Sequence, residues 1–90
     1  MYQDSHELAR RAEQIYEQRL KSQLETSHLN EFVAIEPASG DYFLGSTLSE
    51  AAQALRKAHP ERQGFIMRVG HHAAVHIGAG DDSRLARLVT

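Results

Sequence analysis

Three histidines near the C-terminal end are the side chains of this sequence best suited to binding a metal. His71 and His72 are adjacent, and His76 follows four positions later. On a β-strand His72 and His76 would share a face but stand about 13 Å apart, while His71 would face the other way. The chain has no cysteine that could complete a thiolate zinc site. We therefore expect solvated histidines at a hairpin edge and no metal centre, with pH sensitivity as their alternative role.

The acidic and hydroxyl side chains that could act in catalysis stand where turns and helix caps already explain them. Asp41 follows Gly40 in a turn sequence, and Asp81 and Asp82 follow a glycine-containing segment typical of a solvated linker. The hydroxyl groups of the same central region fall in turns and caps: Ser39, Ser46, Thr47 and Ser49. No G-x-S-x-G elbow, H-E-x-x-H pair or phosphate loop occurs. We expect no enzymatic activity and no bound cofactor.

Basic and aromatic residues offer a third kind of site, a surface for nucleic acid. Four basic residues could gather at one end of a sheet: Arg56, Lys57, Arg62 and Arg68. Three aromatic residues could stack on bases if they were exposed there: Tyr42, Phe43 and Phe65. The alternative is that these rings belong to the core, and the net charge of −2 disfavours a broad electrostatic surface for nucleic acid.

Length and composition describe an ordinary globular protein. The 90 residues suffice for one domain, with 41% hydrophobic and 24% charged residues. No apolar run approaches the ~18 residues of a membrane span, and no charged-then-apolar signal peptide opens the chain. The lack of cysteine fits a reducing compartment, so we expect a cytoplasmic protein that does not enter a membrane.

The elements that would position these side chains begin with one long helix within residues 1–30. Its apolar residues recur at steps of three and four, which is the helical period: Leu8, Ala12, Ile15, Tyr16, Leu20 and Leu24. The stripe drifts around the helix as it advances. It either wraps obliquely over the rest of the domain or pairs with a second copy of the chain.

The body of the domain, residues 32–78, reads as two hairpins around a second helix. Short β-type runs at Phe32–Pro37 and Asp41–Gly45 flank a turn in which Gly40 can take positive φ. Thr47 and Glu50 form a capping box for the helix that follows, and Pro60 ends it. The sequences GFIMRVG and AAVHIG predict the second hairpin. Residues 79–90 are expected to be a flexible tail, although residues 84–89 could form a short helix or strand.

Several short motifs of the body together carry a family resemblance. They are Val33-Ala34-Ile35, Gly40-Asp41-Tyr42, Thr47 with Glu50-Ala51, Pro60, and Arg68-Val69-Gly70. With this pattern, residues 32–78 resemble a group of small bacterial proteins of unknown function. Members are often small partner proteins, some encoded beside a second small gene as in toxin–antitoxin or protease-like pairs, so the resemblance implies a binding role. A looser similarity links the chain to small antitoxin domains whose strand pair precedes a G-x-T-x-E-E-A helix, but the third strand and the DNA-binding extension are missing here.

The predicted fold is α+β in a single domain of residues 1–90. A long N-terminal helix precedes a ββαββ body, a four-stranded and mainly antiparallel sheet with one packed helix. Alternation along the strands predicts a core on one face of that sheet. Its members would be Val33, Ile35, Leu44, Leu48, Ala52, Leu55, Phe65, Met67, Val69, Val75 and Ile77.

The predicted function is a non-catalytic protein-interaction module, a candidate for the small partner of a two-gene bacterial system. The alternative is a small nucleic-acid-binding domain of antitoxin or regulator type. A homodimer is expected because the N-terminal stripe and the open strand edges need covering. The candidate interaction residues are Leu8, Ile15, Tyr16, Leu20, Leu24, Arg56, Lys57, Arg68 and His76.

Overall fold

The computed structural model describes residues 5–71, 74–77 and 87–89 of the chain. The helical elements are α1 (Ser5–Ile15), the π-helix η1 (Tyr16–Leu20), α2 (Lys21–Ser27) and α3 (Leu48–Ala58). The strands are β1 (Phe32–Glu36), β2 (Asp41–Gly45), β3 (Gly64–Arg68), β4 (Ala74–Ile77) and β5 (Arg87–Val89). The α+β class is confirmed.

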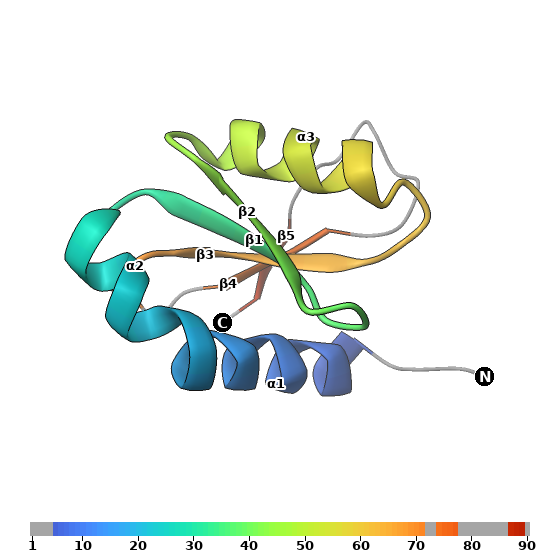
Figure 1. The fold of residues 1–90 in the computed structure, drawn as a ribbon. Coiled ribbons are helices and arrows are strands. Elements are labelled where there is room, and N and C mark those ends of the chain that lie inside the picture. Colours follow the sequence, from blue (N-terminus) through green and yellow to red (C-terminus); the bar gives the residue numbers. More distant parts are fainter. Residues whose placement is uncertain (1–4, 72–73, 78–86, 90) are drawn as a thin grey trace.

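The described strands form one antiparallel sheet in the order β2-β1-β3-β4-β5 (Figure 1). The expectation of four strands was therefore wrong by one. The additional strand β5 lies in the segment predicted as a tail, residues 79–90, and pairs with β4. The rest of that segment, residues 79–86 and 90, lies outside the described residues. In this order β2 has one strand neighbour, and its outer side is an edge of the sheet.

Helices cover both faces of the sheet. Figure 1 shows α3 on one face and the continuous helical segment α1-η1-α2 on the other. The expectation of a core on a single face was therefore wrong, since β1 and β3 are buried from two sides. Alternate residues of these strands face different helices, as the pleat requires.

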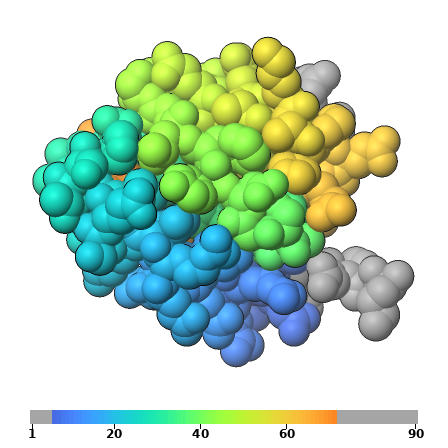
Figure 2. All heavy atoms as spheres, in the orientation of Figure 1, coloured from blue at the N-terminus to red at the C-terminus, as the bar shows by residue number. Residues whose placement is uncertain are grey.

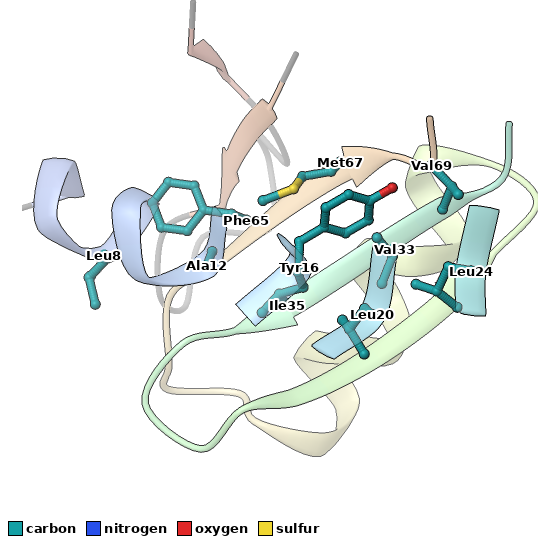
Figure 3. Close-up of a cluster of buried hydrophobic side chains, with 10 residues drawn as sticks. All are labelled: Leu8, Ala12, Tyr16, Leu20, Leu24, Val33, Ile35, Phe65, Met67 and Val69. Carbon is teal, nitrogen blue, oxygen red and sulfur yellow. The ribbon is translucent and has the colours of Figure 1, made fainter. Parts of the chain in front are cut away.

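The core on the α1 side contains the N-terminal stripe (Figure 3). Strand residues Val33, Ile35, Phe65 and Met67, followed by Val69, face it. The helical residues that meet them are Leu8, Ala12, Tyr16, Leu20 and Leu24, each at most 8% exposed. The stripe thus wraps over its own sheet, as the first of the two sequence-based alternatives proposed.

The core on the α3 side is smaller and uses the alternate strand residues. Ala34 and Ile66 pack against three buried residues of the helix: Ala51, Ala52 and Leu55. The prediction that grouped Val33 and Phe65 with the helix residues Leu48, Ala52 and Leu55 was wrong, because these strand residues face α1. The side chains of Val75 and Ile77, which were also predicted for the core, lie outside the described part of the structure.

The π-helix explains how the stripe stays buried. The buried residues of the stripe recur every four positions: Leu8, Ala12, Tyr16, Leu20 and Leu24. In an α-helix each step of four overshoots a full turn by about 40°, so the stripe would rotate away from the sheet. The i→i+5 bonding of residues 16–20 takes more residues per turn and offsets that rotation.

Candidate functional site

Strand β2 places apolar side chains at an open edge of the sheet. Tyr42, Phe43 and Leu44 are half-buried: Tyr42 and Leu44 pack toward the α1-side core and Phe43 toward the α3-side core. Figure 2 shows the green chain around β2 at the surface, between the α3 layer and the blue N-terminal helices. The faces of β2 are thus covered by helices, while its outer edge has no partner strand among the described residues.

The turn at residues 37–40 fixes where β2 begins. Gly40 takes φ +81, and its N–H donates to the Glu36 carbonyl over 2.8 Å. The buried Glu36 carboxylate accepts hydrogen bonds from the backbone N–H groups of Ala38 and Ser39 at 3.0 and 2.9 Å. The acidic residue of the V-A-I-E motif therefore closes the turn by satisfying two backbone donors.

Electrostatics at this end of the sheet favour an ionised Glu36. Arg62 lies 3.3 Å from the same carboxylate, and its side chain is half-exposed. Burial acts to raise the pKa of Glu36, but the hydrogen bonds from Ser39 and Ala38 and the Arg62 charge outweigh it. The pKa is therefore held below the ordinary 4.5. These contacts give the carboxylate a structural role.

A second pair joins β2 to the end of helix α3. The Nε2 atom of His59 lies 2.9 Å from an Asp41 carboxylate oxygen, and its ring meets Phe43 edge-on. A histidine–carboxylate pair can move protons in catalysis. Here the pair links the first residue of β2 to the end of α3, and the same histidine ring packs against Phe43, so these contacts hold the strand against the helix.

The other end of β2 is fixed by the capping box that the sequence predicted. The Thr47 hydroxyl accepts from the Glu50 N–H at 3.1 Å, and Glu50 accepts from the Ser46 N–H and hydroxyl at 2.9 and 2.8 Å. The hydrogen bonds from Ser46 lower the pKa of the Glu50 carboxyl. Strand β2 is therefore anchored at both ends, and its edge is held extended.

The apolar interaction residues predicted on the N-terminal helix belong to the core. Leu8, Tyr16, Leu20 and Leu24 are buried against the strands, and Ile15 is half-buried beside them. The expectation that these residues form an uncovered surface was wrong, because they pack against the strands of their own sheet. The π-helix η1 offsets the drift of the stripe around the helix and keeps it on that side. The argument for a dimer from this stripe is removed, whereas the argument from an open strand edge stands.

The four predicted basic residues do not all lie at one end of the sheet, because Arg68 is separated from the others. Arg62 precedes β3 and Arg68 ends it, so the strand lies between them. The Arg68 guanidinium instead lies 5.6 Å from the Phe32 ring centroid and donates to the Asn30 carbonyl. Arg56 and Lys57 occupy the last turn of α3. Phe65, which could have stacked on bases only if exposed and was also predicted for the core, is fully buried.

The predicted histidine cluster is described in part. The His71 Nε2 atom lies 2.7 Å from the Asn30 side-chain oxygen, and Asn30 itself has φ +72. Residue His76 pairs with Phe65 in the sheet register. The side chains of His72, His76, Asp81 and Asp82 lie outside the described residues. Among the residues described, no group of three potential metal ligands comes together.

A polar contact that the sequence did not suggest lies beneath η1. The buried Tyr16 hydroxyl donates to the Glu25 carboxylate over 2.9 Å and accepts from the Gly70 N–H over 3.2 Å. It borders a shallow hollow that Glu13, Glu17, Met67 and His71 also line. The helical period marked Tyr16 as apolar core, and nothing local in the sequence indicates that Gly70 lies beside it.

In the part of the chain that the structure describes, no helix has the length and apolar character needed to cross a membrane. A scan against protein-family models, a search of curated proteins and a search of solved structures each found no match to this chain. The resemblance of residues 32–78 to small bacterial proteins therefore stays a prediction from the motifs.

Proposed function

We propose that this chain is a non-catalytic protein-interaction module that binds its partner by strand addition at β2. The observation that carries the proposal is the unprotected edge. An edge strand exposes a row of backbone donors and acceptors, and proteins usually guard such edges with lysine, proline or a bulge. Strand β2 has the sequence DYFLG, with one charge at its first residue and none of these guards.

The surroundings of β2 fit recognition of a strand. In strand addition the main chain supplies affinity, and alternate side chains enter neighbouring layers. Helices α1 and α3 leave the edge flanked by an apolar layer on each face, with Tyr42 and Leu44 on one side and Phe43 on the other. An added strand would extend both layers. A cytoplasmic location and a role as the small partner of a two-gene system belong to the same proposal.

The nucleic-acid alternative has no specific support in the geometry. Arg62 and Arg68 lie at opposite ends of β3, and Arg62 is paired with Glu36. Because both faces of the central strands are covered by helices, Phe65 offers no stacking surface.

The test measures how strongly the chain associates with itself and with the product of the neighbouring gene. The wild-type chain is compared with two lysine variants. Tyr42→Lys adds a charge at the edge, and Gln53→Lys adds the same charge on the exposed face of α3. Sedimentation and pull-down should show association that Tyr42→Lys weakens at least tenfold and Gln53→Lys leaves unchanged. Lack of any wild-type association, or equal effects of the two variants, would overturn the proposal.

A further inference from the structure

We infer that the strand bound at β2 is an antiparallel, apolar strand of a partner protein, with a basic residue at its N-terminal end and an acidic residue at its C-terminal end. This inference rests on the proposed function, because it names the chemistry of the partner at the same edge. Two charged side chains of this chain carry it, Arg19 and Glu50, which lie at opposite ends of β2.

Arg19 lies at the end of the edge where β2 begins. Its Nη1 atom is 2.9 Å from the point that a Cβ of Gly40 would occupy, so the guanidinium rests on the turn immediately before Asp41. Arg19 is exposed, and no ion pair or hydrogen bond joins its side chain to another of the described residues. The Asp41 carboxylate is held instead by His59, at the end of α3 on the other face of the sheet. A positive charge is thus available beside this end of the edge.

Glu50 places the opposite charge where β2 ends. Its exposed side chain accepts hydrogen bonds from the N–H and hydroxyl groups of Ser46, the residue after the strand. About 20 Å of extended chain lies between Gly40 and Ser46. Because this exceeds the Debye length of about 8 Å at physiological ionic strength, each end of the edge attracts its own partner charge.

The direction of the added strand follows from the sheet. Every described strand pair is antiparallel, which is also the more stable kind of pairing. An antiparallel strand runs from Ser46 toward Gly40, so its first residue lies near Glu50 and its last near Arg19. Neighbouring strands are about 4.8 Å apart, which an arginine side chain can span. Opposite charges at the two ends would therefore select both the partner and its direction, since a parallel strand would meet like charges.

The test uses two capped peptides of the same composition. One is acetyl-Lys-Thr-Val-Ile-Val-Thr-Glu-amide, and the other exchanges its lysine and glutamate, so that the apolar centre and the net charge are unchanged. Each is titrated into the isotope-labelled chain while the backbone amide signals of β2 are followed by NMR. The first peptide should bind at least about three times more tightly than the second. Raising the salt to about 1 M should bring this ratio close to one.

Two variants of equal net charge show whether Arg19 is the source of the preference. Arg19→Gln should lower the ratio of the two affinities by about half or more. Arg10→Gln removes the same charge from the outer side of α1, beside Glu13 and Gln14, and should leave the ratio unchanged.

Equal affinities of the two peptides for the wild-type chain, or equal effects of the two variants, would overturn the inference and leave strand addition at β2 in place. The absence of any shift of the β2 amides with either peptide would also overturn it. The pull-down with Tyr42→Lys then decides separately whether strand addition itself fails.

Discussion

The Nε2 atom of His59 lies 2.9 Å from the Oδ2 atom of Asp41, joining the end of helix α3 to the first residue of strand β2. The same ring meets Phe43 edge-on, with centroids 6.1 Å apart and planes at 65°. His59 therefore contacts two residues of the strand whose edge we propose as the interaction site. Its contribution should be measurable in the monomer as well as in association.

Replacing His59 by alanine should lower the free energy of unfolding by about 1–2 kcal/mol. The loss comes chiefly from the aromatic contact with Phe43, because an ion pair with the exposed Asp41 carboxylate contributes at most about 1 kcal/mol. Asp41→Asn, which keeps a side-chain acceptor, should change stability by less than about 0.5 kcal/mol. Urea unfolding of both variants measures the difference, and a larger effect of Asp41→Asn would show that charge pairing dominates.

The buried Glu36 carboxylate should make stability depend on acid pH. Because its pKa is lower in the folded chain than its ordinary value of 4.5, the unfolded chain binds its proton first as pH falls. The stabilisation is thus present above that ordinary value and is lost as pH falls through the folded pKa.

Glu36→Gln should remove this part of the acid dependence and cost about 1–3 kcal/mol near neutral pH, since Ala38, Ser39 and Arg62 lose a charged acceptor. Arg62→Met should cost less than about 1 kcal/mol, because its side chain is half-exposed and screened. Urea unfolding from pH 7 downward checks both expectations. If the free energy of unfolding of Glu36→Gln falls with acid pH as it does in the wild-type chain, Glu36 is not the source of the acid dependence.

The features that the sequence predicted correctly are local. Gly40 supplies positive φ in a four-residue turn, and Thr47 with Glu50 caps the helix that follows at once. Both patterns act over three or four positions, so their physics is contained in the segment itself. The period of the N-terminal stripe likewise identified Leu8, Tyr16, Leu20 and Leu24 as one face of a helix.

The assignment of strand faces failed for a reason visible in the residues. Val33, Ala34 and Ile35 are all apolar, as are Phe65, Ile66 and Met67, so neither strand alternates between polar and apolar side chains. Strands buried on both faces read this way, and their periodicity cannot say which helix each residue meets. The edge position of β2 was equally beyond the sequence, because strand order depends on contacts between distant segments.

Two glycines beside β2 should respond differently to alanine. Gly40 has φ +81, and a Cβ there would meet only the flexible end of Arg19, so Gly40→Ala should cost about 1 kcal/mol of backbone strain. At Gly45 a Cβ would lie 2.6 Å from the backbone nitrogen of Ala51, which forces helix α3 away from the strand.

Gly45→Ala should therefore cost about 2–3 kcal/mol, more than Gly40→Ala, although only Gly40 has positive φ. Thermal unfolding of the two variants at equal concentration gives the order. A smaller loss at Gly45 would mean that α3 can shift on β2 without penalty, and that the helix does not fix the strand in place.

Tyr16 should limit stability at alkaline pH. Burial raises the pKa of its phenol above the ordinary 10.0, and the hydrogen bond to Glu25 adds to the rise, while the bond from the Gly70 N–H opposes it. A pKa that is higher in the folded chain gives stabilisation that is present below the unfolded pKa and lost as pH rises through the folded one.

Tyr16→Phe should cost about 1–2 kcal/mol at neutral pH, because Gly70 and Glu25 lose a partner. It should also flatten the decline of the free energy of unfolding above about pH 10. Tyr42→Phe, which removes a phenol from the edge strand, is the matched control and should leave the alkaline decline in place. Urea unfolding at several alkaline pH values decides the matter: identical declines in wild type and Tyr16→Phe would show that the phenol beneath the π-helix stays neutral or that its ionisation is harmless to the fold.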